Sequence, residues 1–422
     1  MTSEIKQRIE QIRRGEVPER YVKTALGLAP VNWKRYTFGD IYTERKEPGD
    51  ENLPLLMVSI RSGVSDGEVD EAELPKKIKR IEDKSQYKKA VSGDLVFNMM
   101  RAWQGAIGAV RTTGMVSPAY IVAEPNDKVY PLFMDCYTRT PQMINQINRQ
   151  SYGVTDFRKR LYWDSFTPIG CILPSIAEQQ KIFTILATQD KVIELKEKRL
   201  AEKQRQKKYL MQQLLTGKKR LPGFSGEWKN IKLCEVLSER KEKNVEQNLR
   251  ICSVAVQKGV IDQVEHLGRS YAANDTSNYS VAHYGDIIYT KSPTGDFLYG
   301  IVKQNLLQEK VAVSPLYGVF TPMTFGLGYF LHTYFQSAIC ARNYLLPIVQ
   351  KGAKNTINIT NDTFISSKLY LPLDVEEQKA IADTFIAADR EIDLLRQDIE
   401  QEKQKKKALM QLLLTGIVRV KT

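Results

Sequence analysis

The sequence predicts a duplicated mixed α/β protein, in which two globular domains of mixed sheet and helices are separated by two long helices that form an antiparallel coiled coil. A segment of about 40 residues occurs twice, from Glu178 to Gly217 and from Glu377 to Gly416, at a constant offset (377 − 178 and 416 − 217 both give 199). Each copy has the seven-residue spacing of a coiled coil. The chain before each copy contains short β-type runs separated by Gly, Pro and Asp. These three observations define the class.

Length, composition and charge limit the function classes. A chain of 422 residues with 42% apolar residues is too long for one core and too apolar for disorder. The formal net charge of +13 indicates a polyanionic partner, either nucleic acid or a membrane surface. No apolar run is long enough to span a membrane and the N-terminus is charged, so we expect no signal peptide and a cytoplasmic location. The five cysteines form no CxxC pair, which predicts reduced thiols without metal.

The predicted organisation follows from these repeats and from linker composition. The segment 218–227 carries Pro, Gly and Ser and separates the first long helix from a restart of the pattern at Trp228. In chain order we expect an N-terminal helix and lead-in at 1–32, a first globular domain at 33–174, a spacer helix at 175–217, a linker at 218–227, a second globular domain at 228–372, a second spacer helix at 373–416 and a tail at 417–422.

Within the first domain, β-type runs occur at 53–60, 94–100 and 120–124, and one helix is predicted near 131–149. A short helix is predicted at 4–14. The second domain repeats landmarks of the first at drifting offsets, which indicates one fold with different loops. The matched pairs are Trp33 and Trp228, Gly93-Asp94 and Gly285-Asp286, Val116-Ser-Pro118 and Val313-Ser-Pro315, and Leu173-Pro174 and Leu371-Pro372.

Each long helix has an apolar seam at both ends and a polar stretch in the middle. A single helix this polar gains little from burial, so we expect the two copies to pack on each other. The seam residues are Ile182, Leu186, Ile193, Leu200, Leu210 and Leu214 in the first copy, and Ile381, Phe385, Ile392, Leu395, Ile399, Leu409 and Leu413 in the second. Two readers with unlike loops, joined by helices and carrying basic charge, fit double-stranded DNA read as two half-sites.

Several motifs resemble the specificity subunit of Type I restriction–modification systems. They are LPSIAEQQKI (173–182), LPLDVEEQKAI (371–381), LMQQLLTGKKRLPGFSGEW (210–228), LMQLLLTG (409–416) and RGEVPERY (14–21). The resemblance spans essentially the whole chain. It is specific because two helix starts each follow Leu-Pro and each helix ends in Leu-Leu-Thr-Gly.

The resemblance implies a non-catalytic chain. Each target recognition domain is expected to read one half of a bipartite DNA sequence, while the helices act as a spacer and dock two methyltransferase subunits. Restriction subunits would join in the full complex, which methylates adenine and cleaves DNA with ATP. S-adenosylmethionine, ATP and Mg²⁺ are expected on those partner subunits, with no cofactor or metal in this chain. The expected location is the bacterial cytosol, at the nucleoid.

Individual residues agree with the absence of a catalytic site. The chain has no Walker motif and no Pro-Pro pair, so it lacks a nucleotide-binding loop and an adenine-methyltransferase motif. Phe325-Gly-Leu-Gly328 falls short of a cofactor glycine turn. The histidines lack metal-ligand spacing. The triplets Glu44-Arg-Lys46 and Glu239-Arg-Lys241 have the ExK pattern of some nucleases without a preceding Pro-Asp.

Candidate DNA contacts were sought in paired loops rich in groups that bind base edges and phosphates. In the first domain they are Arg101, Trp103, Gln104, Tyr152, Thr155, Arg158, Lys159 and Arg160, and in the second Lys291, Thr294, Lys351, Lys354, Asn355 and Thr356. Ordinary solvated loops are the alternative. A basic run on the helices is either a solvated face or a contact surface; its members are Lys203, Arg205, Lys207, Lys208, Lys403, Lys405, Lys406 and Lys407.

Two other functions remain open from the residues alone. The first is a coiled-coil scaffold that does not read sequence, which would bind DNA without sequence preference and with strong salt dependence. The second is a stand-alone nuclease, for which cleavage by the purified chain with Mg²⁺ would be lost on Lys46→Ala.

Overall fold

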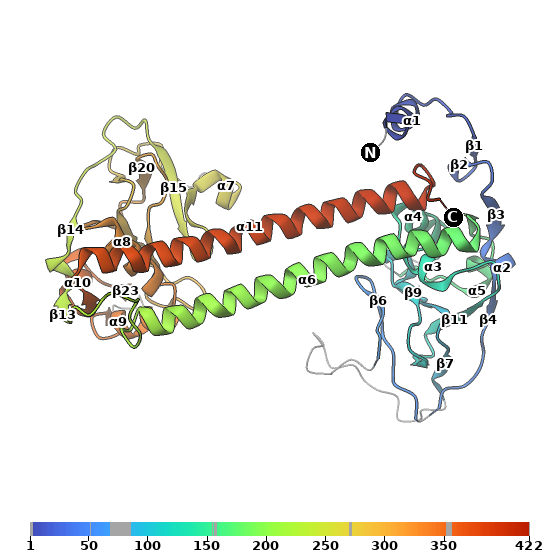
Figure 1. Cartoon of the computed structure of the whole chain (residues 1–422), viewed down its shortest axis with the longest axis horizontal. Helices are drawn as coiled ribbons and strands as arrows, with labels where there is room; N and C mark the ends of the chain where they lie inside the picture. Colours follow the sequence, from blue (N-terminus) through green and yellow to red (C-terminus); the bar gives the residue numbers. More distant parts are fainter. Residues whose placement is uncertain are drawn as a thin grey trace. The chain divides into compact units, whose positions relative to one another are not determined.

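The computed structural model describes residues 3–50, 52–67, 86–153, 155, 158–269, 272–351 and 357–421. The chain folds into two compact units. Unit 1 contains residues up to Lys196 and those from Asp398 onward, and unit 2 contains Glu197 to Gln397. Each unit therefore holds one sheet-rich region and part of each long helix (Figure 1). In the described part of the chain, no helix combines the length and apolarity needed to cross a membrane.

The main sheet of unit 1 is antiparallel and has four strands in the order β4, β11, β8, β9. Strand β8 lies between two neighbours and is buried along its whole length, which suits its Leu-Val-Phe-Asn sequence. In its register Val96 pairs with Val122 on one side and with Gly108 on the other. The strands are β4 (Tyr42–Glu44), β8 (Leu95–Asn98), β9 (Ile107–Ala109) and β11 (Tyr120–Pro125).

Unit 2 repeats this sheet strand for strand in the order β14, β21, β18, β19. The same aromatic contact supports both central strands: Phe97 stacks on Phe166 at 4.7 Å in unit 1, and Tyr289 stacks on Phe364 at 4.4 Å in unit 2. All four rings are buried within the core of their own unit. The strands are β14 (Leu237–Glu239), β18 (Ile287–Tyr289), β19 (Val302–Gln304) and β21 (Gly318–Pro322).

A second sheet differs between the units. In unit 2 it has four strands in the order β16, β15, β20, β17, with β15 and β20 parallel. Their bounds are β15 (Arg250–Ala255), β16 (Gly259–Asp262), β17 (Ser280–Ala282) and β20 (Val311–Val313). In unit 1 the corresponding strands form two separate pairs, β5 (Val58–Ser59) with β6 (Gly63–Val64), and β7 (Lys88–Ala90) with β10 (Gly114–Val116). Both units are thus mixed sheet and helix, and the predicted duplicated α/β class is confirmed.

Shorter elements complete each unit. In unit 1 they are α1 (Ser3–Arg13), the hairpin β1 (Tyr21–Thr24) and β2 (Gly27–Pro30), the pair β3 (Lys34–Thr37) and β12 (Gly170–Leu173), α2 (Phe38–Ile41), η3 (Ala102–Gln104), α3 (Pro131–Tyr137), α4 (Pro141–Gln150) and α5 (Trp163–Phe166). In unit 2 they are the pair β13 (Trp228–Lys232) and β24 (Lys368–Pro372), η4 (Leu233–Glu235), α7 (Gln263–Leu267), α8 (Phe325–Tyr334), α9 (Ala338–Leu345), the pair β22 (Gln350–Lys351) and β23 (Ile357–Asn358), and α10 (Asn361–Ser366).

Two element predictions need correction. The single helix expected near 131–149 is two helices, α3 and α4, because Pro141 disfavours a helical conformation at Thr140 and instead begins a new helix that Thr140 caps through its side chain. The run 53–60 is a strand only at Val58–Ser59, with an isolated bridge at Leu55. Its apolar residues face a small core without continuous strand pairing.

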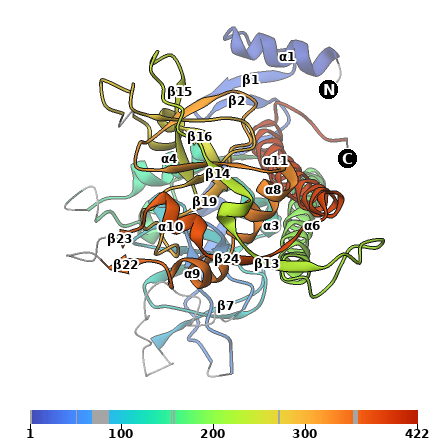
Figure 2. The same ribbon diagram turned by 90° about the vertical axis from the view of Figure 1, so that its left-hand side faces the viewer.

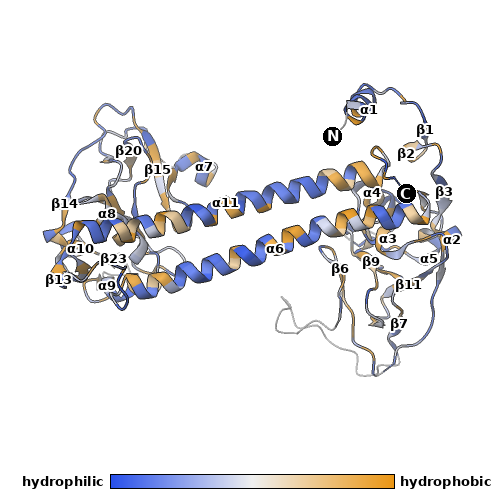
Figure 3. Cartoon of the chain, in the orientation of Figure 1, coloured by the Kyte–Doolittle hydropathy of each residue, from blue (hydrophilic) through white to orange (hydrophobic). Residues whose placement is uncertain are grey.

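The two long helices, α6 (Ile176–Leu214) and α11 (Val375–Leu414), lie side by side and run antiparallel, as predicted (Figures 1 and 2). Bands of hydrophilic and hydrophobic residues alternate along both (Figure 3). The seam residues at the helix ends join the domain cores: Ile182, Leu186 and Leu413 pack in unit 1, and Leu214, Ile381 and Phe385 pack in unit 2. The ends of the seam therefore belong to the cores of the two units as much as to the helix pair.

Ion pairs join the polar middle of the helices. In unit 1, Lys196 Nζ lies 2.8 Å from Asp398 and 2.9 Å from Glu402. In unit 2, Lys203 Nζ lies 3.0 Å from Glu391. The hydrogen bond from Lys196 is the first cause that lowers the pKa of Glu402, to about 2, followed by the one from Gln189. Because these groups are solvent-accessible, the ion pairs contribute modestly to stability and mainly set the register.

A buried carboxylate clamps each end of the helix pair. In unit 1, Glu178 at the start of α6 accepts hydrogen bonds from Trp33 and from Arg419, which follows α11. In unit 2, Glu377 at the start of α11 accepts hydrogen bonds from Trp228 and from Arg220, which follows α6. Each clamp joins the beginning of one helix to the residues that follow the other.

The glutamine after each clamp carboxylate ties the helix to the sheet-rich region. Gln179 Nε2 donates to Pro174 O at 3.0 Å, and Gln378 Nε2 donates to Pro372 O at 2.9 Å. Gln179 Oε1 also accepts from the backbone of Tyr130. The repeated Glu-Gln dipeptide is therefore explained by two separate structural roles.

Candidate nucleic-acid interface

Two loops of unit 1 that were predicted to contact DNA lie next to each other. The first follows β8 and includes η3, and the second follows α4. The backbone N–H of Leu161 donates to Met99 O at 2.9 Å, and Lys159 Nζ donates to Asn148 of α4 at 3.2 Å. Segments about 60 residues apart in the sequence thus form one surface region, which we call loop surface 1 (residues 99–105 and the described residues of 152–161).

The first loop presents side chains from a tight turn. Arg101 and Gln104 are exposed, whereas Trp103 is half-buried and its indole N–H donates to Met100 O at 3.1 Å. Gly105 closes the turn with φ of +101°, a conformation that residues with a side chain rarely adopt. Trp103 therefore positions the loop, and Arg101 and Gln104 are the groups free to reach a ligand.

The second loop adds an aromatic ring and two guanidinium groups. Tyr152 and Arg160 pair as a short antiparallel bridge, and the ring of Tyr152 lies 5.3 Å from that of Tyr162. Tyr152, Thr155, Arg158 and Arg160 are exposed. Residues 154, 156 and 157 fall outside the described residues.

The arginines of loop surface 1 have no acidic partner among the described residues. In the part of the chain that the structure describes, no carboxylate lies within 4 Å of Arg101, Arg158 or Arg160. By contrast, Arg45 of the same unit binds Asp94 at 2.8 Å. Exposed and unpaired guanidinium groups gathered on one surface are suited to binding phosphate oxygens.

In unit 2 the corresponding loop connects β18 to β19. Lys291 has φ of +57° and is half-buried, and burial lowers its pKa. Thr294 is exposed and pairs with Phe297 across the tip of the turn. Gly300 has φ of +99° and occupies the place of Gly105; a Cβ on Gly300 would lie 2.9 Å from the nitrogen of Lys291. The turn is shared by both units, but its side chains differ.

The last group of predicted residues is only partly described. Lys351 lies in β22, which pairs with β23 as a hairpin. Lys354, Asn355 and Thr356 lie between these strands, outside the described residues.

The basic run on the helices is largely tied to acidic residues. Lys203, Lys207 and Lys406 pair with Glu391, Asp389 and Asp190 on the opposite helix, and Lys405 pairs with Glu402 on its own. Lys208 and Lys407 are exposed. Sequence reasoning missed these pairs because their partners are distant in the chain.

The triplets with an ExK pattern have a structural role at their central arginine. Arg45 binds the buried Asp94, and Arg240 binds the buried Asp286, in equivalent places of the two units. Among the described residues, no group of three His, Cys, Asp or Glu side chains is arranged to hold a metal ion.

A further feature of the helices escaped the sequence analysis. Leu195 of α6 is 54% exposed and Leu394 of α11 is 56% exposed. These residues occupy the same position of the repeat, since 394 − 195 is also 199. The signal was present in the constant offset, but solvent exposure was needed to recognise it.

Comparison with known proteins points to one family. Residues 226–404 match the family model described as the Type I restriction modification DNA specificity domain. The MjaVIII specificity subunit of a Type I restriction enzyme from Methanocaldococcus jannaschii is 22% identical over 449 aligned residues, covering 96% of this chain and 97% of that protein. A putative MjaX specificity subunit from the same organism is 48% identical over 64 residues, 15% of each chain.

Solved structures share the fold. The HsdS subunit from Thermoanaerobacter tengcongensis aligns with a TM-score of 0.51 and 18% identity, covering 92% of this chain and 98% of that one. The S subunit of a Type I restriction–modification system from M. genitalium aligns with a TM-score of 0.53 and 10% identity, covering 93% and 97%.

Proposed function

We propose that this chain, which belongs to the Type I restriction–modification specificity-subunit family, reads a bipartite DNA target with one half-site for each recognition domain. As a specificity subunit the chain recognises DNA sequence and is not itself an enzyme. The proposed reading domains are residues 33–174 and 228–372, and the proposed location is the cytoplasm, at the nucleoid.

The observation that carries the proposal is the repeated sheet with unlike loops. The two main sheets have the same strand order and the same aromatic support, whereas the loops after β8 and β18 share only the closing glycine turn. A common scaffold with different loop side chains suits two different half-sites. The proposed contacts are Arg101, Trp103, Gln104, Tyr152, Thr155, Arg158, Lys159 and Arg160 for one half, and Lys291, Thr294, Lys351, Lys354, Asn355 and Thr356 for the other. Trp103 and Lys159 also hold their loops in place, and exposed Arg and Gln reach bases and phosphates.

A domain exchange tests this proposal. Residues 228–372 are replaced by the matching domain of a relative with a different target, and adenine methylation is mapped in genomic DNA from cells that carry the whole system. Only one half of the methylated motif should change. An exchange of 33–174 is the matched control and should change only the other half. A motif that changes in both halves, or in neither, contradicts the proposal.

We also propose that the helix pair docks two copies of a methyltransferase subunit, with restriction subunits joining in the full complex. S-adenosylmethionine, ATP and Mg²⁺ would then belong to those subunits. The supporting observation is the pair of exposed leucines, Leu195 and Leu394, at equivalent places on α6 and α11. A partner that binds twice needs the same apolar contact twice.

The docking proposal is tested by co-purification of the methyltransferase subunit with charged variants. Leu195→Asp and Leu394→Asp should each remove about one of two bound copies, measured by native mass spectrometry, and the double variant should remove both. Leu316→Asp, at a residue 72% exposed in unit 2, is the control and should keep both copies. Two copies retained by the double variant would rule out this docking surface.

A further inference from the structure

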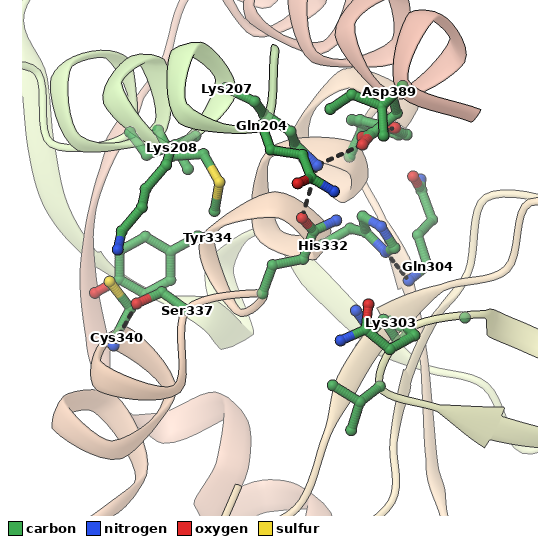
Figure 4. Close-up of a pocket in the computed structure, with 18 of the residues that line it drawn as sticks. Gln204, Lys207, Lys208, Lys303, Gln304, His332, Tyr334, Ser337, Cys340 and Asp389 are labelled. Carbon is green, nitrogen blue, oxygen red and sulfur yellow. Dashed lines mark hydrogen bonds and ion pairs between the residues drawn. The ribbon is translucent and has the colours of Figure 1, made fainter. Parts of the chain in front are cut away.

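Unit 2 contains a pocket of about 930 Å³ where its parts of α6 and α11 meet α8 and β19 (Figure 4). Lys207 approaches from α6, Asp389 from α11 and His332 from α8, while Lys303 and Gln304 come from β19. None of these residues belongs to the proposed DNA-contacting loops. The pocket is therefore a separate feature of the second recognition domain.

Two polar side chains on the β19 side of the pocket have unused bonding capacity. Lys303 is 3% exposed, and its side chain makes no hydrogen bond or ion pair with any described residue. Gln304 is 1% exposed; its Nε2 donates to Gly285 O at 2.9 Å, but its Oε1 has no partner. An ammonium group buried without a close acceptor is costly, so its presence in a pocket indicates a site for an anion.

The charged side chains that enter the pocket from the middle of the two long helices are already paired. Lys207 binds Asp389 and donates to Gln336 at 2.9 Å, and the hydroxyl of Tyr329 donates to Asp389 at 3.0 Å. Asp393 accepts from Arg396 at 3.0 Å. Asp389 makes no ion pair with Lys303 and acts on it only by longer-range electrostatic attraction. The positive charge of Lys303 is thus available to a ligand.

Part of the remaining wall is apolar. Met211 of α6, Val260 of β16 and Ile392 of α11 line the pocket, with Tyr334 beside them. Exposed lysines, Lys208 and Lys258, lie at the rim. The lining is thus cationic at one place and apolar at others, which suits an amphipathic molecule.

Neither DNA nor a repeated protein partner fits this pocket well. A phosphate on a duplex is flanked by sugars and cannot enter to a side chain that is 3% exposed. The equivalent place in unit 1 is a pocket of about 600 Å³, where Gly108 replaces Lys303 and the buried carboxylate of Asp135 replaces His332. In unit 1 the buried carboxylate is partnered by Arg111, 3.5 Å from Asp135, so a partner that binds both units through one surface would not find a buried lysine there.

We propose that the pocket of unit 2 binds a small amphipathic organic anion. Its single carboxylate or phosphate group meets Lys303, and its apolar body lies against Met211, Val260 and Ile392. The proposal is independent of the DNA target and of the docking of other subunits.

The pocket predicts a pH dependence for binding. Burial, then the charge of Lys207, lowers the pKa of Lys303 to about 8. His332 stays neutral because burial holds its pKa far below its usual value, and burial raises the pKa of Tyr329 and, to about 12, that of Tyr334. Between pH 7 and pH 9.5, the buried ammonium group of Lys303 therefore loses its positive charge. Anion affinity should be constant below pH 8 and fall above it.

The test uses the full-length chain and three fluorescent probes with one apolar body. They are 1-naphthyl phosphate, 1-naphthaleneacetate and the neutral 1-naphthaleneacetamide, titrated at pH 7 and pH 9.5. At least one anion should bind saturably with one site per chain and at least tenfold more tightly than the amide at pH 7. Binding of only the phosphate, or only the carboxylate, identifies the source of the ligand chemistry.

Variants locate the site. Lys303→Met should weaken anion binding at least tenfold and remove its pH dependence, while Lys88→Met, at a half-buried lysine of unit 1, should bind like the original chain. Val260→Trp fills the pocket without changing charge and should also abolish binding. The proposal is overturned if neither anion saturates, if the amide binds equally well, or if Lys303→Met binds as tightly as the original chain.

Discussion

Strand β9 of unit 1 carries Gly108 where strand β19 of unit 2 carries Lys303, and the side chains facing them differ accordingly. Asp135 Oδ1 accepts from the backbone N–H of Ala109 at 3.1 Å, and His332 Nδ1 accepts from that of Gln304 at 3.0 Å. Each contact joins equivalent elements of its own unit, β9 to α3 in unit 1 and β19 to α8 in unit 2. Burial raises the pKa of Asp135 and lowers the pKa of Lys303. The two units therefore share this hydrogen bond between strand and helix. The buried ionisable side chain beside it is the acidic Asp135 in unit 1 and the basic Lys303 in unit 2.

The helices above these sites did not diverge in the same way. Lys406 pairs with Asp190 in unit 1, and Lys207 pairs with Asp389 in unit 2, at positions related by the constant offset. The comparison indicates that the helix pair and its clamps form a framework that both units share. The residues beneath them are free to change with the individual role of each unit.

The largest effect is expected from the clamps, in which the two units are alike. Glu178→Ala and Glu377→Ala should each destabilise their own unit by about 3 kcal/mol, because an arginine and a tryptophan N–H lose a buried carboxylate. Local hydrogen–deuterium exchange would measure this. Deletion of residues 417–421 should loosen unit 1 only, since it removes Arg419 and leaves Arg220 intact. Equal loosening of both units after the deletion would show that the clamps are not independent.

The second effect distinguishes the units. Lys303→Met should stabilise unit 2 by up to about 3 kcal/mol at pH 7, because a shift from 10.5 to about 8 corresponds to about 1.4 kcal/mol per pH unit. Below pH 8 the lysine is charged in both the folded and unfolded states and its full cost is present. Between pH 8 and pH 10.5 the unfolded state binds more protons, so the stability of the original chain should rise with pH.

Denaturant unfolding of the full-length chain at pH 7 and pH 10.5 checks this prediction. Lys303→Met should lack the rise that the original chain shows, and Lys88→Met should keep it. A destabilised Lys303→Met chain at pH 7 would mean that the ammonium group is satisfied in the folded state.

The third effect concerns loop surface 1, whose arginines have no counterpart among the described residues of the unit 2 loop. Arg158→Ala and Arg160→Ala should each weaken DNA binding several-fold, and each should reduce the slope of log affinity against log salt by about 0.9. Fluorescence anisotropy at several salt concentrations measures both quantities. Lys23→Ala, at an exposed lysine of β1, is the control. An unchanged salt slope in both arginine variants would remove these residues from the DNA interface.

The smallest effect is expected in acid. The pKa of Glu402 is lowered to about 2 by Lys196 first and Gln189 second. A depressed carboxyl pKa gives stability above the unfolded value, about 4.5, and that stability is lost as pH falls toward 2. Hydrogen exchange in the 189–196 segment should therefore rise between pH 4.5 and pH 2. Glu402→Gln should show the faster exchange already at neutral pH, and high salt should reduce the difference.

The overall architecture could be predicted from the heptad periodicity and from the constant offset between the repeats, because both can be read directly from the sequence. The heptads of α6 and α11 and the drift-free offset between them predicted two long antiparallel helices. The break between α3 and α4 was also readable, since Pro141 is visible in the sequence. It was missed because helical periodicity continues on both sides of the break.

The site was less accessible from sequence. Adjacency of the loops around Arg101 and Arg160 depends on a backbone contact between Met99 and Leu161, which no local pattern encodes. The clamp arginines, Arg220 and Arg419, follow matching Thr-Gly pairs and could have been found from the offset alone. No sequence pattern predicted that Lys303 is buried. A lysine between Val302 and Gln304 is typical of an exposed strand position, and only the fold shows that all three residues of β19 are buried.

The division of the chain between the units has a consequence for its synthesis. Unit 2 is made from one continuous stretch, Glu197 to Gln397, whereas unit 1 needs Asp398 to Arg419 as well as the first 196 residues. During translation the earlier half of unit 1 must therefore wait, with Glu178 and Trp33 lacking Arg419, until all of unit 2 has emerged from the ribosome. The nascent first domain is then the part of the chain most exposed to chaperones and proteases.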